Sequence, residues 1–340
     1  MFKSNVCILS ILPCLLATPI VAQDTTPFYR DKIVSVLNGF GPGGSNDIWA
    51  RSLARHMGKH LPGNPRLINQ NMPGAGTLTL ANHLGVTAPR DGSVFGVISK
   101  GIPLEPLFGG KGIQFDPLAM TWIGSPDRDT NVCVARKDSK VQAMSDLFNT
   151  ELVVGATGSG ADTAVYPEFL RELLGVKLKT IKGYPGSTDV MLGIERKELD
   201  GICVSYVSIA RQKIYLDGSI NIILQAGFER DPAVPAHVPM AIDLATTPSD
   251  ISALRLFASR AALGRPFVAP PGLSADRTKA LRDAFDATMK DKEFIFEVEK
   301  QGLTVEPIGG VALSQMLSGI YKTPKDVVNA VSQVLARISN

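Results

Sequence analysis

The feature that most constrains the fold is a regular alternation of short apolar runs with segments of helical period. Residues 32–37 form an apolar run, and residues 47–61 then place their apolar side chains on one helical face. Strands that alternate with helices favour an α/β fold built around mainly parallel sheets. Further runs that we interpret as strands lie at residues 67–68, 94–99, 122–123, 132–134, 152–154, 178–181, 201–204 and 220–224.

The last third of the chain has a helical pattern. Ser274 can cap one helix, and two others are predicted around residues 313–320 and 327–338. Earlier, Gly175 is a natural end for the helix that carries Phe169.

The N-terminal residues have the pattern of an export signal. Lys3 precedes an apolar run over residues 6–16, and the small residue Ala22 precedes a polar stretch. A membrane anchor is the alternative, but a spanning helix needs roughly 20 apolar residues and Pro13 interrupts this run. We expect a signal peptide over residues 1–22 and a soluble, periplasmic mature chain.

Composition and charge exclude several classes of protein. With 44% apolar and 20% charged residues, the chain is neither disordered nor a coiled coil. A net charge of +3 argues against nucleic-acid binding, which needs a strong basic surface. Beyond the leader only Cys133 and Cys203 remain, and they are either a disulfide or two buried thiols on strands.

Two glycine-rich turns each stand between a predicted strand and a predicted helix. The first runs from Gly41 to Asp47, and the second from Gly155 to Gly160. Glycines allow a close backbone approach, so successive N–H groups can converge where a helix presents its positive end. Each turn is a candidate anion cradle. Such turns are also common in parallel sheets that bind nothing there.

Neither turn matches an enzyme fingerprint. The second lacks the third glycine of the dinucleotide pattern and the spacing of a hydrolase elbow, and no Lys-Ser or Lys-Thr follows either turn. His56 and His60 have a metal-compatible spacing, but a solvated basic face explains them better, and we predict no metal and no cofactor. Lys100, at a strand end, is a surface lysine or a counter-ion for an acidic ligand.

These motifs resemble the periplasmic solute receptors of tripartite tricarboxylate transporters, known as Bug proteins. The family pattern Phe-x-x-Gly-Gly-x-x-Asp-x-x-Ala-Arg is matched by residues 40–51, and Asn-x-Pro-Gly-Ala-Gly by residues 71–76. A Pro-Asp-Gly turn appears over residues 89–92 with one residue inserted. In the second turn, Ala161 and Ala164 stand where the family usually has Thr and His, and Tyr184-Pro185-Gly186 replaces Tyr-Lys-Gly.

The resemblance implies a two-lobed Venus-flytrap fold of type II, in which the chain crosses between lobes twice. We place the crossings near Asp127 and Phe257, so residues 23–127 and 258–340 form lobe 1 and residues 128–257 form lobe 2. It also implies a receptor, without enzymatic activity, that holds a small organic carboxylate by backbone amides and delivers it to membrane transporter subunits. We expect a monomer.

The residues expected to line the ligand site lie on the glycine-rich turns and on nearby strand ends. An exported hydrolase or transferase that uses the same cleft is the alternative function, as is a ligand-sensing partner of a signalling protein. The expected ligand-binding residues are Phe40, Gly41, Gly43, Gly44, Ser45, Asp47, Gly74, Gly76, Lys100, Thr157, Gly158, Ser159, Gly160, Tyr184, Gly186, Ser187 and Ser205.

Overall fold

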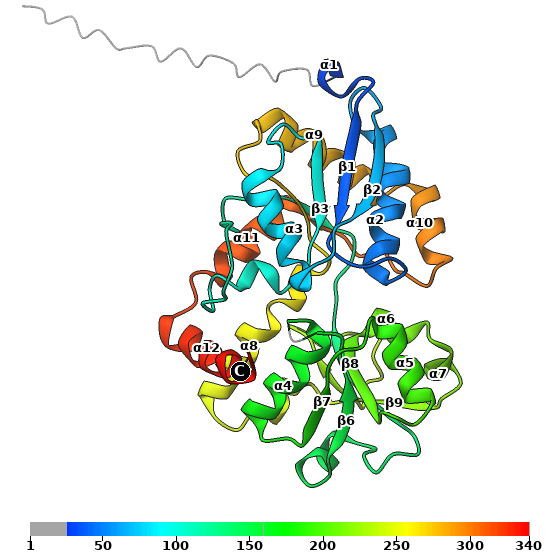
Figure 1. Cartoon of the computed structure of the whole chain (residues 1–340), viewed down its shortest axis with the longest axis vertical. Helices are drawn as coiled ribbons and strands as arrows, with labels where there is room; N and C mark the ends of the chain where they lie inside the picture. The colour runs from blue at the N-terminus through cyan, green and yellow to red at the C-terminus, as the bar shows by residue number, and fades with distance from the viewer. Residues whose placement is uncertain (1–25, 159, 340) are drawn as a thin grey trace, which may run out of the picture.

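The protein has two lobes, each built on one sheet with helices packed against it (Figure 1). The computed structural model describes residues 26–158 and 160–339, so the predicted signal peptide over residues 1–22 lies outside the described residues. This architecture confirms the two-lobed α/β fold expected from the sequence.

The first lobe contains a six-stranded sheet in the order β11-β4-β10-β3-β1-β2. Its strands are β1 (Ile33–Asn38), β2 (Arg66–Asn71), β3 (Val94–Val97), β4 (Thr121–Ser125), β10 (Phe267–Ala269) and β11 (Ile308–Gly309). Its helices are α2 (Ser45–His56), α3 (Leu78–Asn82), α9 (Ala275–Thr288), α10 (Lys292–Glu299) and α11 (Gly310–Ile320), with α1 (Thr26–Tyr29) at the start. The N-cap of α9 is Ser274, as predicted.

The second lobe contains a five-stranded sheet in the order β7-β6-β8-β5-β9. Its strands are β5 (Asn131–Arg136), β6 (Leu152–Gly155), β7 (Leu178–Ile181), β8 (Gly201–Ser205) and β9 (Ile220–Ala226). The helices that pack on it are α4 (Asp162–Leu174), α5 (Ser187–Glu195), α6 (Tyr206–Ala210), α7 (Lys213–Leu216), α8 (Pro248–Ala258) and α12 (Lys325–Ser339). Gly175 ends α4 in the left-handed conformation, as predicted.

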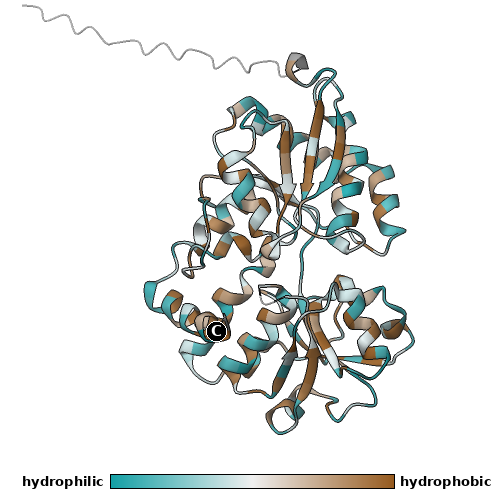
Figure 2. Ribbon diagram, in the orientation of Figure 1, coloured by the Kyte–Doolittle hydropathy of each residue, from teal (hydrophilic) through white to brown (hydrophobic). Residues whose placement is uncertain are grey.

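Helices cover both faces of each sheet, so the central strands are buried and mostly apolar, whereas the edge strands β2 and β7 are more polar and partly exposed. Alternate residues of β5 divide between two cores: Cys133 and Ala135 join one, and Val132 and Val134 the other. In the first lobe, α2, α9 and α10 cover one face of the sheet and α3 and α11 the other. Figure 2 shows the apolar strands inside each lobe and the polar outer surfaces of the helices.

The sheets are mixed, whereas the sequence pattern predicts mainly parallel ones. In the first sheet β10 is antiparallel to β3 and β4, and in the second β5 is antiparallel to β8 and β9. The reason lies in the crossings, because β5 and β10 are the strands that receive the chain from the other lobe. A strand that starts at the boundary between the lobes must run away from it, opposite to its neighbours.

It follows that most strands point toward the other lobe. β4 ends at Ser125 and the chain then enters the second sheet at Asn131, so β4 ends at the lobe boundary. β1, β2 and β3 run in the same direction as β4 and therefore also end at this boundary. In the second sheet β8 and β9 end opposite Asn131, and β6 and β7 run parallel to β8. The carboxyl ends of the two sheets therefore face each other (Figure 1).

The C-terminal helix departs from the predicted lobe boundaries. The prediction assigns all of residues 258–340 to lobe 1, but α12 packs against α8 and α4, and its residues Val331 and Val334 belong to the core of the second lobe. The chain thus passes between the lobes a third time, after α11. An amphipathic pattern shows that a helix has a partner surface and leaves open which lobe provides it.

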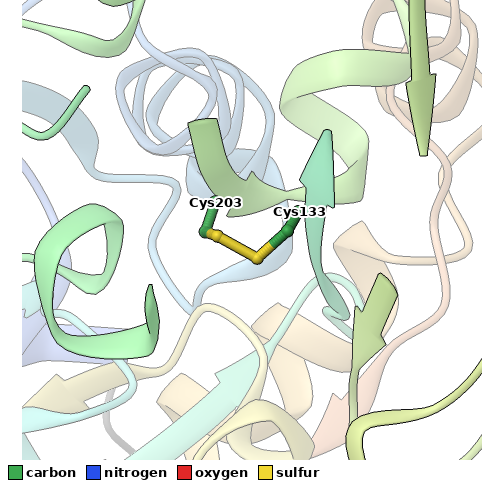
Figure 3. Close-up of a disulfide and its surroundings, with 2 residues drawn as sticks. All are labelled: Cys133 and Cys203. Carbon is green, nitrogen blue, oxygen red and sulfur yellow. A yellow bond between two sulfur atoms is a disulfide. The ribbon is translucent and has the colours of Figure 1, made fainter. Parts of the chain in front are cut away.

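The two cysteines of the described chain form a disulfide. Cys133 in β5 and Cys203 in β8 lie directly opposite each other in the antiparallel pair, with their Cα atoms 4.0 Å apart (Figure 3). Both are buried. Of the two possibilities left open by the sequence, the structure has the bridge, and it ties the crossing strand β5 to the centre of the second sheet.

Candidate functional site

The loop after β1 is held by the carboxylate of Asp47. Its Oδ2 accepts hydrogen bonds from the Gly43 backbone N–H at 3.0 Å and from Arg51 Nε at 2.8 Å, and its Oδ1 accepts from Asn38 Nδ2 at 2.9 Å and Asn71 Nδ2 at 2.8 Å. Burial alone would raise the pKa of Asp47, but the donors lower it below its ordinary value. Asp47 therefore fixes the shape of this loop.

The start of α2 offers hydrogen-bond donors at the boundary between the lobes. The helix begins at Ser45, directly after Gly44, and no side chain caps it. The first N–H groups of a helix have no partner within the helix and carry partial positive charge. The amide of Gly43 is engaged by Asp47, so the donors that remain belong to the first turn of α2. Apart from chain neighbours, nothing lies within 4 Å of a β-carbon built on Gly41 or Gly44.

The second glycine-rich turn has the same organisation. The backbone N–H of Thr157 donates to Oγ1 of Thr163 at 3.1 Å, so a hydroxyl of α4 holds the turn. Gly158 and Gly160 have open space beside them, and α4 starts at Asp162 without a side-chain cap. The predicted residue Ser159 lies outside the described residues.

A third uncapped helix start follows β7. Gly186 precedes α5, which begins at Ser187 with no side-chain cap. The Tyr184 side chain packs into the core beneath α5, and its hydroxyl lies 3.3 Å from the point where a β-carbon on Gly193 would stand. Helices α2, α4 and α5 thus all begin where strands end at the lobe boundary, whereas the ring of Tyr184 points into its own lobe.

The two lobes approach each other closely at two glycines. A β-carbon built on Gly76, in the loop after β2, would stand 3.3 Å from the carbonyl oxygen of Gly160. Two residues earlier, Gly74 packs against Thr79, with 2.5 Å between the β-carbon position and Oγ1. The peptide of Phe40 is anchored as well, because its carbonyl accepts a hydrogen bond from Asn71 at 2.9 Å.

Lys100 is buried between the lobes and engaged by carboxylates of the chain itself. Its Nζ donates a hydrogen bond to Asp129 Oδ2 and lies 3.6 Å from Asp162 Oδ2. Burial opposes the charged ammonium, but the carboxylates of Asp129 and Asp162 and the hydroxyl of Tyr166 outweigh it and raise the pKa of Lys100. Of the two interpretations of Lys100, a surface lysine is wrong, because the residue is 5% exposed. A counter-ion for an acidic ligand stays a prediction, and carboxylates of the chain already pair with this ammonium.

A second buried cation joins the crossing segments. Arg265 Nη1 pairs with Asp127, while Nη2 donates to Ser205 Oγ at 3.0 Å and approaches Ser45 Oγ at 3.4 Å. Ser205 in turn donates to Asp129. The predicted residues Ser45 and Ser205 are therefore brought together by a guanidinium that lies between them.

Sequence reasoning missed most of this buried charged network. Arg260 is 4% exposed, its guanidinium lies 4.9 Å from the ring centre of Phe257, and its Nη2 lies 3.9 Å from both Glu105 and Asp162. A β-carbon on Gly101 would stand 1.9 Å from that Nη2, so a larger residue there would require the Arg260 guanidinium to move. The sequence signal that could have identified Arg260 is its position close to the predicted second crossing between the lobes.

The network also contains buried polar atoms without a well-formed hydrogen bond. Among the described residues these include Nε of Arg260, Nε of Arg265, the hydroxyl of Tyr166 and the amide nitrogen of Asn131. Buried polar groups are nearly always hydrogen-bonded in folded proteins. Atoms of this kind also occur away from the network, at Asn69, Arg136 and Thr180, so they do not by themselves mark a ligand site.

His56 and His60 are part of an ion-pair cluster between helices rather than of a solvated basic face. His56 Nε2 lies 2.9 Å from Glu297, and His60 Nε2 lies 2.9 Å from Asp291. The ligand atoms of His56, Asp291 and Glu293 fall within 4.8 Å of one another, a spacing compatible with a metal ion. The Lys59 ammonium lies 2.7 Å from Asp291 and 2.6 Å from Glu293 and supplies positive charge there.

Two surface pockets lie away from the lobe boundary. One lies along α11, beside Ser314 and Gly319, and the other, of about 540 Å³, lies in the second lobe beside Arg136 and Lys213. Neither contains a residue of the predicted ligand site. Within the described part of the chain, no helix combines the length and the apolar content needed to cross a bilayer.

Opposed sheet ends, three crossings and a polar boundary define a two-lobed periplasmic solute-binding fold, and solved structures of the TctC and Bug type share it. BugD, a periplasmic binding protein, matches with a TM-score of 0.68 and 21% identity over 92% of this chain and 98% of its own. MatC from Rhodopseudomonas palustris, solved with bound malate, matches with a TM-score of 0.67 and 21% identity over 87% and 98%.

A TctC solute-binding protein from Polaromonas is also similar, with a TM-score of 0.62 and 18% identity over 87% of this chain and 98% of that one. At these identities the similarity establishes the fold. No protein-family model matches the sequence, and a search of curated proteins found no match.

Proposed function

We propose that this protein is an extracytoplasmic receptor that captures a small organic carboxylate between its two lobes. The observation that carries the proposal is the set of uncapped N-termini of α2, α4 and α5, all at the boundary toward which the strands of both sheets run. Helix starts are favourable anion sites, because their N–H groups and dipoles both face the ligand. The proposed ligand contacts remain those predicted on the glycine-rich turns.

Ligand binding would couple to closure of the lobes. Donors at the start of α2 belong to the first lobe, and donors at the starts of α4 and α5 belong to the second. A ligand that touches both lobes binds the closed arrangement better than an open one, so it shifts the equilibrium toward closure. The closed shape is then what a transporter of the tripartite tricarboxylate type would recognise.

The finer parts of the proposal rest on the structural relatives. Malate is bound in MatC, and adipate accompanies another Rhodopseudomonas palustris protein of this fold. These ligands support a carboxylate as the cargo, and the periplasmic solute-binding proteins among the structural relatives support a periplasmic location and a function without chemical turnover. Export by the segment over residues 1–22, a membrane transporter as partner and a monomeric state belong to the same proposal.

A thermal-shift screen of the mature protein against mono-, di- and tricarboxylates tests this function. A binding carboxylate raises the melting temperature by mass action, because it binds the folded state alone. Mass spectrometry of the released compound then separates a receptor from an exported enzyme, since a receptor returns its ligand unchanged. No shift with any carboxylate, or recovery of a converted product, contradicts the proposal.

A further inference from the structure

Three buried cations between the lobes face carboxylates of the chain. Lys100 faces Asp129 and Asp162, and Arg265 faces Asp127. Arg260 faces Glu105 and Asp162. Within the described residues, these three buried cations thus meet four carboxylates, so their charge is largely compensated within the chain, while the partly buried Arg211 adds a further positive charge near Arg265. We take backbone amides at the helix starts as the main donors to a ligand carboxylate.

Asp162 occupies a distinctive place among these carboxylates. It is the first residue of α4 and lies two residues after Gly160, beside the open space of the second glycine-rich turn. Its nearest cationic nitrogens, Lys100 Nζ at 3.6 Å and Arg260 Nη2 at 3.9 Å, lie beyond ordinary hydrogen-bond distance. Its side chain is also partly accessible, at 21% exposure, whereas those of Asp127 and Asp129 are almost fully buried.

This carboxylate changes what the start of α4 can accept. The first turn of α4 would otherwise attract a ligand anion just as the first turn of α2 does. An anion placed there stands beside Asp162, and like charges brought together in a partly desolvated site repel strongly. The start of α2 carries no such problem, because Asp47 is turned inward onto four donors.

We infer that Asp162 restricts the receptor to ligands with a single carboxylate, which binds at α2, while the ligand's other end is an uncharged or cationic donor facing Asp162. The inference rests on the proposed function and names its ligand class. It separates this chain from a receptor of diacids such as malate. The Asp162 carboxylate would accept a hydrogen bond from the ligand's hydroxyl, amide or ammonium group.

Calorimetric titration with matched ligand pairs tests the inference. Succinate and adipate are compared with their monoamides, succinamate and adipamate, which have nearly the same shape and one carboxylate fewer. We expect the wild-type protein to bind a monoamide about tenfold or more tightly than its diacid. In Asp162→Asn, the affinity for the diacid relative to that for its monoamide should rise by about tenfold. Asp326→Asn, the same change of charge at an exposed first-turn position of α12, should leave the ratio unchanged.

Several results would overturn the inference. A wild-type protein that binds diacids as tightly as monoamides contradicts it, and this comparison needs no variant. An unchanged ratio in Asp162→Asn also contradicts it, and Asp162→Ser serves if the first variant does not fold. Absence of binding by all four compounds and by every carboxylate of the thermal-shift screen overturns the proposed function and the inference with it. Binding of these compounds without a preference for the monoamides overturns the inference and leaves the proposed function standing.

Discussion

The carbonyl oxygen of Gly160 lies 3.3 Å from the point where a β-carbon on Gly76 would stand, so the two lobes touch through two residues without side chains. Gly76 belongs to the loop after β2 and Gly160 to the turn after β6. The contact therefore joins loops at the carboxyl ends of both sheets. Both positions are exposed, and Gly160 lies two residues before the start of α4, one of the helix starts at the lobe boundary.

Gly76→Ala is expected to hinder closure of the lobes. The added methyl group meets the Gly160 carbonyl at a tight distance, and the φ of +62° at Gly76 is itself unfavourable for alanine. Gly109→Ala is the matched control, because Gly109 has a φ of +77° and no neighbour within 4 Å of its β-carbon position. Small-angle scattering should show a more open Gly76→Ala and an unchanged Gly109→Ala. Equal scattering profiles for the two variants would contradict the account.

Asp47→Asn is expected to destabilise the first lobe. The substitution removes a buried anion that accepts four hydrogen bonds and replaces one acceptor oxygen by a donor, which should cost about 1–3 kcal/mol of unfolding free energy. Urea denaturation measures the change. Asp138→Asn is the control, because Asp138 also pairs with cations but is exposed, and surface pairs contribute little. A loss no larger in Asp47→Asn than in Asp138→Asn would show that the loop does not depend on this carboxylate.

Acid should weaken the contact between α2 and α10 through Glu297. Hydrogen bonds from Arg55 lower the pKa of Glu297 from 4.5 to about 2, against the effect of burial, with further donors from Ser52 and His56. A carboxyl with a lowered folded-state pKa contributes stability above its unfolded pKa, and this contribution is lost as the pH falls toward 2. Urea midpoints between pH 5 and pH 2.5 should therefore converge for wild type and Glu297→Gln. A constant gap across this range would refute the assignment.

The Cys133–Cys203 bridge should contribute substantially to stability. It closes a loop with a sequence separation of 70 residues, for which chain entropy gives about 2–5 kcal/mol. The double variant Cys133→Ala, Cys203→Ala should show this loss of unfolding free energy as a lower denaturant midpoint. Thiol titration of the denatured wild-type protein should find no free thiol in the mature chain. Two free thiols would show that the bridge is absent in solution.

The sequence predicted the fold because its signals are local. The glycine-rich turns after residues 32–37 and 152–154 stand between strands and helices as expected, and Gly175 and Ser274 mark helix ends. The direction of individual strands was harder to predict from the sequence. The antiparallel β10 has only three residues, and its reversal follows from where the chain re-enters the first lobe.

The buried charges could not be predicted for a related reason. Asp129, Arg260 and Arg265 occur in segments that connect the two lobes, and a charged residue usually faces solvent. Their burial arises because two crossing segments, far apart in sequence, meet at the lobe boundary. Likewise, the sequence spacing of Gly43 and Asp47 does not reveal that the backbone N–H of Gly43 donates to the Asp47 carboxylate and is therefore not available to a ligand. This hydrogen bond depends on the conformation of the loop.

The central claim is that backbone amides at the start of α2 hold a ligand carboxylate, and a pair of substitutions at Ser45 tests it most directly. Proline fits the first position of a helix and removes only an N–H that the helix does not use, and Gly44, with φ −79° and ψ 170°, suits a residue before proline. Ser45→Ala removes the same hydroxyl and keeps the amide. Calorimetric titration with the carboxylate that gives the largest thermal shift should show binding at least about tenfold weaker for Ser45→Pro than for Ser45→Ala. Equal affinities would contradict the account.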